Sequence, residues 1–463
     1  MRQPPVLSRL LRGALLAFAL ALVASPAEAM PAFARKYGTS CTTCHTVFPR
    51  LSPFGEAFRR NGYRFPGIDG DYIKQEHIPL GNDEQKKVFP RAIWPGLLPA
   101  SAPLAVAVNG SANFHPDKNS GAALADNGAA ISINDLVGEA HLFAGGSFTE
   151  RLTYFAQLTF HSDGTVEIED AHIHFNDLLR RKHEINVWVG KGGPGTLTSF
   201  GLHSSYLSDV MMAPLAVTAL YGASSESWSL VNNYTGAEVN GVIGGRFDYS
   251  IGVNAGSNNS IRVPENAYAH VGFKLGGMRL DGEGGGGPPT TDRPWEETSF
   301  ALDAFAYRSK SRFTNASMAS QDDVALTFGA NVRLQLRSFE LNSGIYQERH
   351  DHATVDNRAV NALSQYNELS YIVFPWLVPA LRLDLSRLEP AGLPAATDFR
   401  ITPGVAFLIV ANLKLVLAAQ IEWAQGVAPV GGWGEAGGFA APPNPTKGVL
   451  EVETVTLTTW FAF

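Results

Sequence analysis

An alternation of apolar and polar side chains runs through most of this chain and constrains its fold more than any other feature. Leu413 and Leu415 share one face of a predicted strand, and Lys414 lies on the other. Successive side chains of a β-strand point to opposite faces, so a period of two predicts strands. The pattern recurs over 152–160 and 324–336. Strands with one apolar face fit a barrel with a lipid-facing outside and a wet interior.

We expect 16 such strands, an even number, as the barrels of bacterial outer membranes require. The terminal Phe463 shares a face with Phe461 and Leu457, and a terminal aromatic residue is typical of these barrels. The alternative is the edge strand of a soluble sandwich. The predicted fold class is all-β, a transmembrane antiparallel β-barrel with a small N-terminal helical segment. The predicted strands are 104–114, 134–144, 151–161, 167–176, 184–191, 235–243, 246–256, 266–278, 299–308, 322–336, 339–348, 363–373, 379–388, 397–408, 411–423 and 451–463.

The connections between these strands alternate between short and long. If both ends of the barrel lie in the periplasm, the short connections fall on the periplasmic side and the long ones outside. Segment 192–234 is long enough to fold inward as a constriction or lid, and the Gly-rich stretch 280–297 is unusually long for a periplasmic turn. The short connections are 145–150, 244–245, 337–338 and 375–378, and the other long ones are 115–133, 349–362 and 424–450.

The first 29 residues have the pattern of a secretory signal peptide. Arg2, Arg9 and Arg12 form a basic start, an apolar stretch over 13–24 follows, and Ala27-Glu28-Ala29 is a cleavage site. No later apolar run is long enough for a transmembrane helix. The net charge of −7 comes with no basic patch, so nucleic acid is an unexpected partner. Export and the strand pattern together predict the bacterial outer membrane.

Cys41-Thr42-Thr43-Cys44-His45 is a C-x-x-C-H motif, the signature of covalent c-type haem attachment. Each cysteine sulfur would add to one vinyl group of a single haem, and His45 would be the first axial ligand of the iron. Cys41 and Cys44 are the only two cysteines in the sequence, which excludes a larger disulfide framework. The alternatives are a redox-active C-x-x-C pair or a chance match.

The haem segment is expected to span 30–65 and to contain one short helix, 53–61. Ser52 fits the N-cap, Pro53 the first helical position and Gly62 the stop. The segment is rich in apolar side chains that would cover the porphyrin, namely Phe33, Tyr37, Phe48, Leu51, Phe54, Phe58, Tyr63 and Phe65. Its basic residues Arg35, Lys36, Arg50, Arg59 and Arg60 are either partners of the haem propionates or solvated.

So few residues cannot bury enough surface to stand alone as a domain, and the rest of the chain must provide the missing wall. The second axial ligand is predicted to be His77, because it is near in sequence and histidine is a common haem ligand. Met30, Met211 and Met212 are the other candidates, and a five-coordinate iron is also open. Residues 66–102, broken by prolines and glycines, are interpreted as a linker or plug, and 103–463 as the barrel.

The haem segment resembles that of the fused monohaem cytochrome–porins, whose best-known members are outer-membrane iron oxidases. The resemblance rests on Phe33-Ala34-Arg35-Lys36-Tyr37-Gly38, Cys41–His45, Phe48-Pro49, Pro53-Phe54-Gly55 and Phe58, and over the barrel it is one of architecture only. It implies electron transfer across the outer membrane, with haem bound by Cys41 and Cys44 and ligated by His45. The haem segment would sit at or inside the barrel from the periplasmic side.

Three functions follow as hypotheses. The first is an electron conduit with Fe(II) oxidase activity, in which extracellular Fe(II) is the donor and a periplasmic c-type cytochrome the acceptor. The second is a solute channel whose haem-bearing segment is a regulatory plug. The third is a haem enzyme held in a barrel, which would need a distal His–Arg pair that is absent near the motif.

Two further groups contain metal-ligating residue types. Asp170, His172 and His174 share one strand face and should point into the lumen, where His141 and His161 are also candidates. They would bind a transition metal, relay a proton or line a polar lumen. Of these three roles we favour the polar lumen. The second group is predicted to lie in an external loop and consists of Glu348, His350, Asp351 and His352. These residues would either capture Fe(II) or belong to a solvated loop without a function in binding, and we favour the solvated loop.

Overall fold

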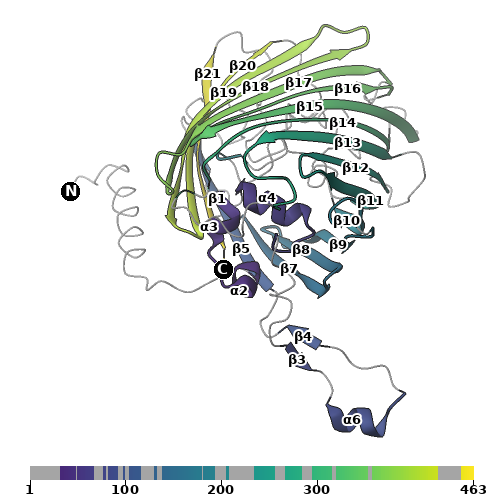
Figure 1. Ribbon diagram of the computed structural model, residues 1–463. Coiled ribbons are helices and arrows are strands. Elements are labelled where there is room, and N and C mark those ends of the chain that lie inside the picture. The colour runs from purple at the N-terminus through teal and green to yellow at the C-terminus, as the bar shows by residue number, and fades with distance from the viewer. Residues whose placement is uncertain are drawn as a thin grey trace, which may run out of the picture.

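Sixteen strands of seven or more residues close into one antiparallel barrel in the part of the chain that the structure describes. Neighbours in sequence are neighbours in the sheet, and β21 pairs with β5 to close it (Figure 1). The three-residue strand β6 pairs with the end of β5. The strands are β5 (Leu104–His115), β6 (Ala130–Ser132), β7 (Glu139–Thr149), β8 (Leu152–His161), β9 (Val166–Phe175), β10 (Asn186–Gly192), β11 (Tyr234–Ile243), β12 (Phe247–Asn254), β13 (Ala267–Gly276), β14 (Glu297–Thr314), β15 (Ser320–Arg337), β16 (Phe339–His350), β17 (Val360–Tyr371), β18 (Leu377–Pro390), β19 (Ala396–Val410), β20 (Leu413–Gln425) and β21 (Glu451–Ala462).

This is a computed structural model, and the residues that it describes cover most of the mature chain. The expected signal peptide, Met30 and Phe463 lie outside them. The described residues are 32–47, 50–66, 77–79, 82–91, 97–99, 104–115, 130–132, 138–179, 181–192, 205–207, 234–255, 266–283, 293, 295–314, 320–352, 357–425 and 450–462.

The predicted barrel and its strands are confirmed, with one clear shift. Strand β7 was expected over 134–144 and runs instead from Glu139 to Thr149. Gly145 and Gly146, which suggested a turn, lie inside the strand and pair with Phe155 and Tyr154. A Cβ on Gly145 would lie 2.5 Å from Cζ of Phe33, so the missing side chain makes room for the N-terminal segment.

The inside and outside of the barrel differ in polarity as the alternation predicts. On β15, Phe328 and Leu336 point outward and are 45% and 48% exposed, whereas Asn331 and Arg333 point inward and are buried. An apolar exterior around a polar interior inverts the pattern of a soluble protein and is typical of a membrane barrel. Among the described residues, no helix is long and apolar enough to cross a membrane.

The N-terminal segment, residues 32–66, lies in one end of the barrel (Figure 1). It contains α2 (Ala32–Tyr37), α3 (Cys41–Cys44), β1 (His45–Val47), β2 (Arg50–Leu51) and α4 (Pro53–Arg60). Its partners include Glu150, Asp177 and Asp281, which all belong to connections at the end with the short turns. We call residues 32–66 the docked segment.

Helix α4 forms where the sequence predicts it. The Ser52 hydroxyl accepts a hydrogen bond from the Gly55 N–H at 3.2 Å, and Pro53 occupies the first turn. Gly62 ends the helix region with φ of +66°, a left-handed conformation that suits glycine. The cap and the stop are local signals, so the expected helix over 53–61 is confirmed within one residue.

An arm joins the docked segment to the barrel. It contains β3 (His77–Pro79), α6 (Asp83–Val88) and β4 (Leu97–Pro99), with β3 and β4 paired as an antiparallel hairpin. Figure 1 draws this arm outside the barrel, away from α3. The boundaries at 66 and 102 stay predictions.

Candidate functional site

The C-x-x-C-H motif forms a single turn of helix followed by a strand. Cys41 and Cys44 are the first and last residues of α3, and His45 begins β1. Residues three apart in a helix lie on the same face, so the two sulfur atoms are presented together. Ser40 caps the turn by accepting from the Thr42 N–H at 3.3 Å. Neither cysteine forms a disulfide.

The start of α4 holds the main chain of this turn. The Ser52 N–H donates to the Cys44 carbonyl at 2.8 Å, and the Ser52 hydroxyl donates to the Thr43 carbonyl at 2.9 Å. Gly55 lets the helix approach this closely, because a Cβ there would lie 2.0 Å from the Cys44 oxygen. Both hydrogen bonds from Ser52 use main-chain carbonyls of the motif. They do not involve the sulfur atoms of Cys41 and Cys44.

The electrostatics of the cysteines do not fit a redox-active pair. Burial raises the pKa of the Cys44 thiol to about 12, with a further rise from Cys41, and burial also raises the pKa of Cys41. Reactive C-x-x-C pairs need a lowered pKa, because the thiolate is the nucleophile. Two unpaired, shielded cysteines followed by a histidine fit the residues that would hold a covalent haem.

Cys44 packs against a cluster of aromatic side chains. Tyr37, Phe54, Phe58 and Phe65 are buried at 1–5% exposure, and we call these four residues the aromatic cluster. Phe33, Tyr63, Cys44 and Met278 pack against it. The sequence predicts all of these aromatic residues but not Met278, which arrives from the β13–β14 connection. Phe48 lies outside the described residues.

Buried ion pairs attach the docked segment to strands β15 and β16. Arg50 pairs with Glu340, and Arg333 pairs with Glu56. The Nε atom of Arg333 also lies 2.8 Å from Oε1 of Glu340, so two arginines and two glutamates form one network. All four side chains are at most 4% exposed. The network places α4 and β2 against one side of the barrel wall.

The basic residues of the segment make protein contacts rather than facing solvent as single charges. Arg35 donates to the Leu104 carbonyl, and Lys36 donates to the Ser147 hydroxyl at 3.1 Å. Arg60 lies 3.4 Å from Asp248. The Arg50 side chain, at 1% exposure, is not solvated, because it is buried against Glu340 in the barrel wall. Arg35 and Lys36 are partly exposed, so the choice between solvent and haem propionates stays open for them.

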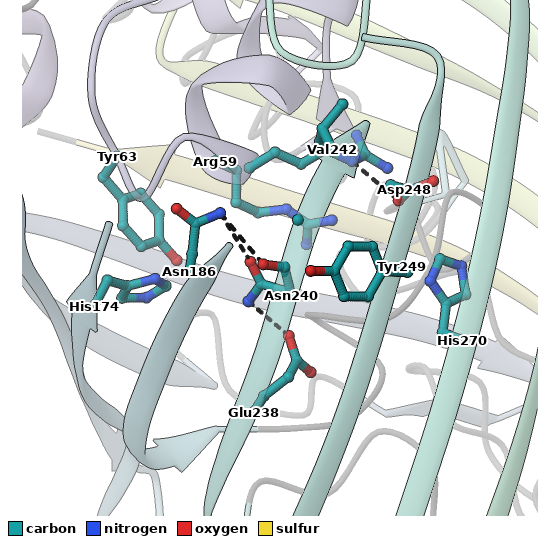
Figure 2. Close-up of a pocket in the computed structure, with 12 residues that line it drawn as sticks. Arg59, Tyr63, His174, Asn186, Glu238, Asn240, Val242, Asp248, Tyr249 and His270 are labelled. Atoms are coloured by element: carbon teal, nitrogen blue, oxygen red, sulfur yellow. Dashed lines mark hydrogen bonds and ion pairs between the residues drawn. The ribbon is translucent and has the colours of Figure 1, made fainter. Parts of the chain in front are cut away.

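Arg59, the fifth candidate for a propionate partner, lines a polar pocket between the end of α4 and strands β9 to β13 (Figure 2). The pocket is partly open to solvent. Asn240 donates to Glu238 at 2.9 Å on its floor, and Figure 2 shows Arg59 pointing towards these groups. Tyr63 and His174 lie at one side and His270 at the other. Cys41 and Cys44 are not among its lining residues, so the pocket is separate from the motif.

Asp170, His172 and His174 point into the lumen, as predicted, and are 6–7% exposed. His172 and His174 share a hydrogen bond of 2.8 Å between Nδ1 and Nε2, and Asp170 lies 3.9 Å from His172. His141 contacts the Thr159 hydroxyl at 2.9 Å, and His161 contacts Glu139 at 3.1 Å. These contacts describe a hydrogen-bonded polar lumen.

Of the second predicted group, two residues lie in strand β16 and two follow it. Glu348 and His350 belong to β16 and point inward, with 5% and 3% exposure, so their placement in an external loop is wrong. Strand β16 continues two residues further than its apolar pattern indicates, because His350 is paired with Asp323 at 2.7 Å and with Glu348 at 3.2 Å. Asp351 and His352 follow the strand and are exposed. Across the described chain, no group of three or more His, Cys, Asp and Glu residues is arranged to hold a metal ion.

The structure does not bring His77 to the motif. His77 begins β3 in the arm outside the barrel, whereas His45 begins β1 in the docked segment (Figure 1). The assignment of His77 as second axial ligand therefore receives no support from the arrangement and stays a prediction. The other candidates, Met30, Met211 and Met212, lie outside the described residues.

Three residues of the long connection between β10 and β11 are described, and they lie inside the barrel. Ser205, Tyr206 and Leu207 are at most 1% exposed. The Tyr206 N–H donates to Glu368 at 3.0 Å, and the Arg50 guanidinium lies 4.7 Å from the centre of the Tyr206 ring. This part of the connection therefore contacts the docked segment directly. The rest of the connection lies outside the described residues.

The comparisons with known proteins agree with this barrel. No family model matches the sequence, and no curated protein matches it. The solved structure of an anion-selective porin from Comamonas acidovorans matches with a TM-score of 0.51 and 11% identity, over 78% of this chain and 98% of that chain. The trimer form of OmpT from Vibrio cholerae matches with a TM-score of 0.50 and 13% identity, over 78% and 98%. At these identities the likeness shows the fold alone, which is a porin-type barrel. No family match supports the resemblance to the cytochrome–porins.

Proposed function

We propose that this protein is an outer-membrane cytochrome–porin that moves electrons across the membrane through one covalent haem c. Extracellular Fe(II) is the proposed donor, and a periplasmic c-type cytochrome is the proposed acceptor. Each Fe(II) ion would lose one electron and become Fe(III), and the periplasmic cytochrome would gain that electron. The porin-type fold and the apolar outer surface support the membrane part of the proposal.

One observation carries the haem part: the C-x-x-C-H motif is fixed inside the end of the barrel. Arg50 and Glu56 are tied to Glu340 and Arg333 by buried ion pairs. A short segment that cannot shelter a cofactor alone obtains a wall from the barrel. The docking of this segment supports the proposal that the barrel shelters the haem.

The residues of the chain have distinct roles in this proposal. Cys41 and Cys44 would hold the haem, and His45 would ligate its iron, which would supply one-electron redox chemistry when bound. The aromatic cluster excludes water on the Cys44 side. Tyr206, which contacts Arg50, brings the inward connection to the same place. Low polarity around an iron centre favours its less charged, reduced state.

The short connections are proposed to face the periplasm. The chain enters the barrel at this end, since the docked segment, the start of β5 and the end of β21 all lie there. The docked segment would then meet a periplasmic acceptor, and Fe(II) would approach from the opposite opening through the lumen.

Rapid mixing of the oxidised, haem-loaded protein with Fe(II) tests this function. We expect Fe(II) to reduce the haem, measured by its absorption bands. His45→Ala should abolish the reduction while the barrel stays folded. His352→Ala is the matched control, because His352 is exposed and follows β16, and it should react as the native chain does. Oxidised haem that Fe(II) leaves unchanged across the working pH range would exclude Fe(II) oxidation.

The second candidate is a solute channel with the docked segment as a regulatory plug. The polar lumen and the porin-type barrel favour it. Conductance in planar lipid bilayers separates the two functions. A steady conductance that does not depend on the redox state would support the channel, whereas a closed barrel with redox activity would support the conduit.

A further inference from the structure

We propose that Met278 would supply a second ligand, in addition to His45, for the iron of a haem held by Cys41 and Cys44. This inference rests on the proposed function, because it presupposes a haem bound at Cys41 and Cys44. It replaces His77 by a residue that the fold brings to the motif from the β13–β14 connection.

The docked segment itself has no second ligand to offer. Residues 32–66 contain His45 as their single histidine and contain no methionine. A second ligand of either common kind must therefore come from a part of the chain that packs against this segment. The β13–β14 connection is one such part, since Asn61 donates to the Asp281 carbonyl at 2.9 Å.

Met278 packs against the aromatic cluster that Cys44 also contacts. It is the only methionine among the residues that the structure describes. Its thioether is a soft donor with three rotatable bonds, and it can adjust to an iron centre without moving the main chain. A half-buried methionine beside a haem-attachment cysteine is a candidate ligand by position as well as by chemistry.

The main chain at Met278 is fixed. Its N–H donates to Oε2 of Glu297 at 3.0 Å, and Arg246 donates to the Gly277 carbonyl at 3.1 Å. Gly276 and Gly277 have φ of +71° and +55°, where other residues are strained, so the sharp turn before Met278 needs these glycines. A fixed turn holds the side chain over the aromatic cluster.

The nearest histidines are less suited. His174 reaches the segment through Tyr63, whose ring centre lies 5.6 Å from that of His174. The Nε2 atom of His174 is already engaged with Nδ1 of His172 at 2.8 Å. Tyr63 therefore lies between these histidines and the aromatic cluster, whereas Met278 contacts the cluster directly.

A methionine ligand has a clear spectroscopic signature. We expect the oxidised, haem-loaded full chain to be low-spin and to show the weak long-wavelength band of charge transfer from methionine sulfur to ferric iron. Met278→Leu should lose this band, become high-spin and show a lower midpoint potential, because methionine ligation raises the potential. Met278→His should restore the low-spin state without the sulfur band.

Met30→Leu, Met211→Leu and Met212→Leu are the competing variants, because they remove the other methionines that the sequence leaves open as ligands. Loss of the sulfur band in any of them, or its persistence in Met278→Leu, would overturn the assignment. Magnetic circular dichroism of the native protein tests the assignment even if the variants do not assemble. A loaded haem that shows no methionine ligation would exclude Met278. A native chain without covalent haem would overturn the proposed function itself, which is a different and recognisable result.

Discussion

The docked segment meets the barrel on two sides that differ in chemistry. Towards β15 and β16 it is held by the buried charges of Arg50 and Glu56. Towards β8 and β9 it is held mainly by rings: the Tyr63 ring stacks on Phe155 of β8, with centres 4.9 Å apart, and lies 5.6 Å from the ring of His174 of β9. The first side is a network of four buried charges, whereas the second combines ring contacts with the single ion pair of Arg64 and Asp177.

The difference suggests a division of labour. Buried ion pairs are costly to break, because the partner left behind is an uncompensated charge, so they fix where the segment sits. Stacked rings add only modest energy beyond their buried area, but they exclude water beside the cysteines. The charged side would set position, and the aromatic side would set the dryness of the site.

Arg333→Met should have the largest effect on docking, because it leaves Glu56 and Glu340 buried without their shared partner. We expect docking to weaken by about 3–5 kcal/mol while the barrel stays closed. Hydrogen exchange of the amides in 32–66 measures the loss. Arg382→Met is the matched control, because Arg382 pairs with Asp384 on its own strand at 2.8 Å. Equal exchange in both variants would contradict a special role for the network.

Tyr63→Leu should have a smaller effect on docking, of about 0.5–1.5 kcal/mol, because it removes the stacked ring pair with Phe155 of the barrel. Tyr63→Phe keeps the rings and should behave almost as the native chain. The same exchange experiment applies, with attention to the amides of Cys41–His45. If Tyr63→Leu loosened the segment more than Arg333→Met, the proposed division between the two sides would be reversed.

The barrel was predictable from the sequence because its signals are local. Alternation along a single strand shows which residues face out, and Leu336 and Phe328 are exposed as that pattern indicates. The errors occurred where a tertiary contact overrides the local signal. Gly145 suggests a turn but makes room for Phe33, and His350 is predicted in a polar loop but lies in β16, which runs two residues beyond the predicted strand.

The contacts of the site were not predictable, because they join residues far apart in the chain. Arg50 and Glu340 are separated by 290 positions, and Glu56 and Arg333 by 277. No spacing or motif links such pairs in one sequence. The Gly-rich stretch 280–297 shows the same limit: its length is explained only by contacts such as Trp295, which is buried in a cluster with Val47 of the docked segment.

Acid should weaken the ion-pair network of Arg50, Glu56, Arg333 and Glu340. Burial alone would raise the pKa of Glu56, but the positive charges of Arg333, Arg60, Lys274 and Arg50 outweigh it and lower the pKa below 4.5. The docked state therefore binds fewer protons, so the contribution of Glu56 is complete above about pH 4.5 and is lost as the pH falls through the lowered pKa.

Hydrogen exchange of 32–66 over a falling pH series measures this effect, which we expect to be the smallest of the three. Glu56→Gln should flatten the pH dependence, because an amide does not titrate. Glu84→Gln is the control, since Glu84 is exposed on α6 and pairs with Lys87 at 2.8 Å. A pH dependence unchanged in Glu56→Gln would show that acid acts on another group, such as Asp177 beside Arg64, and would place the pH-sensitive contact on the side of β9 instead.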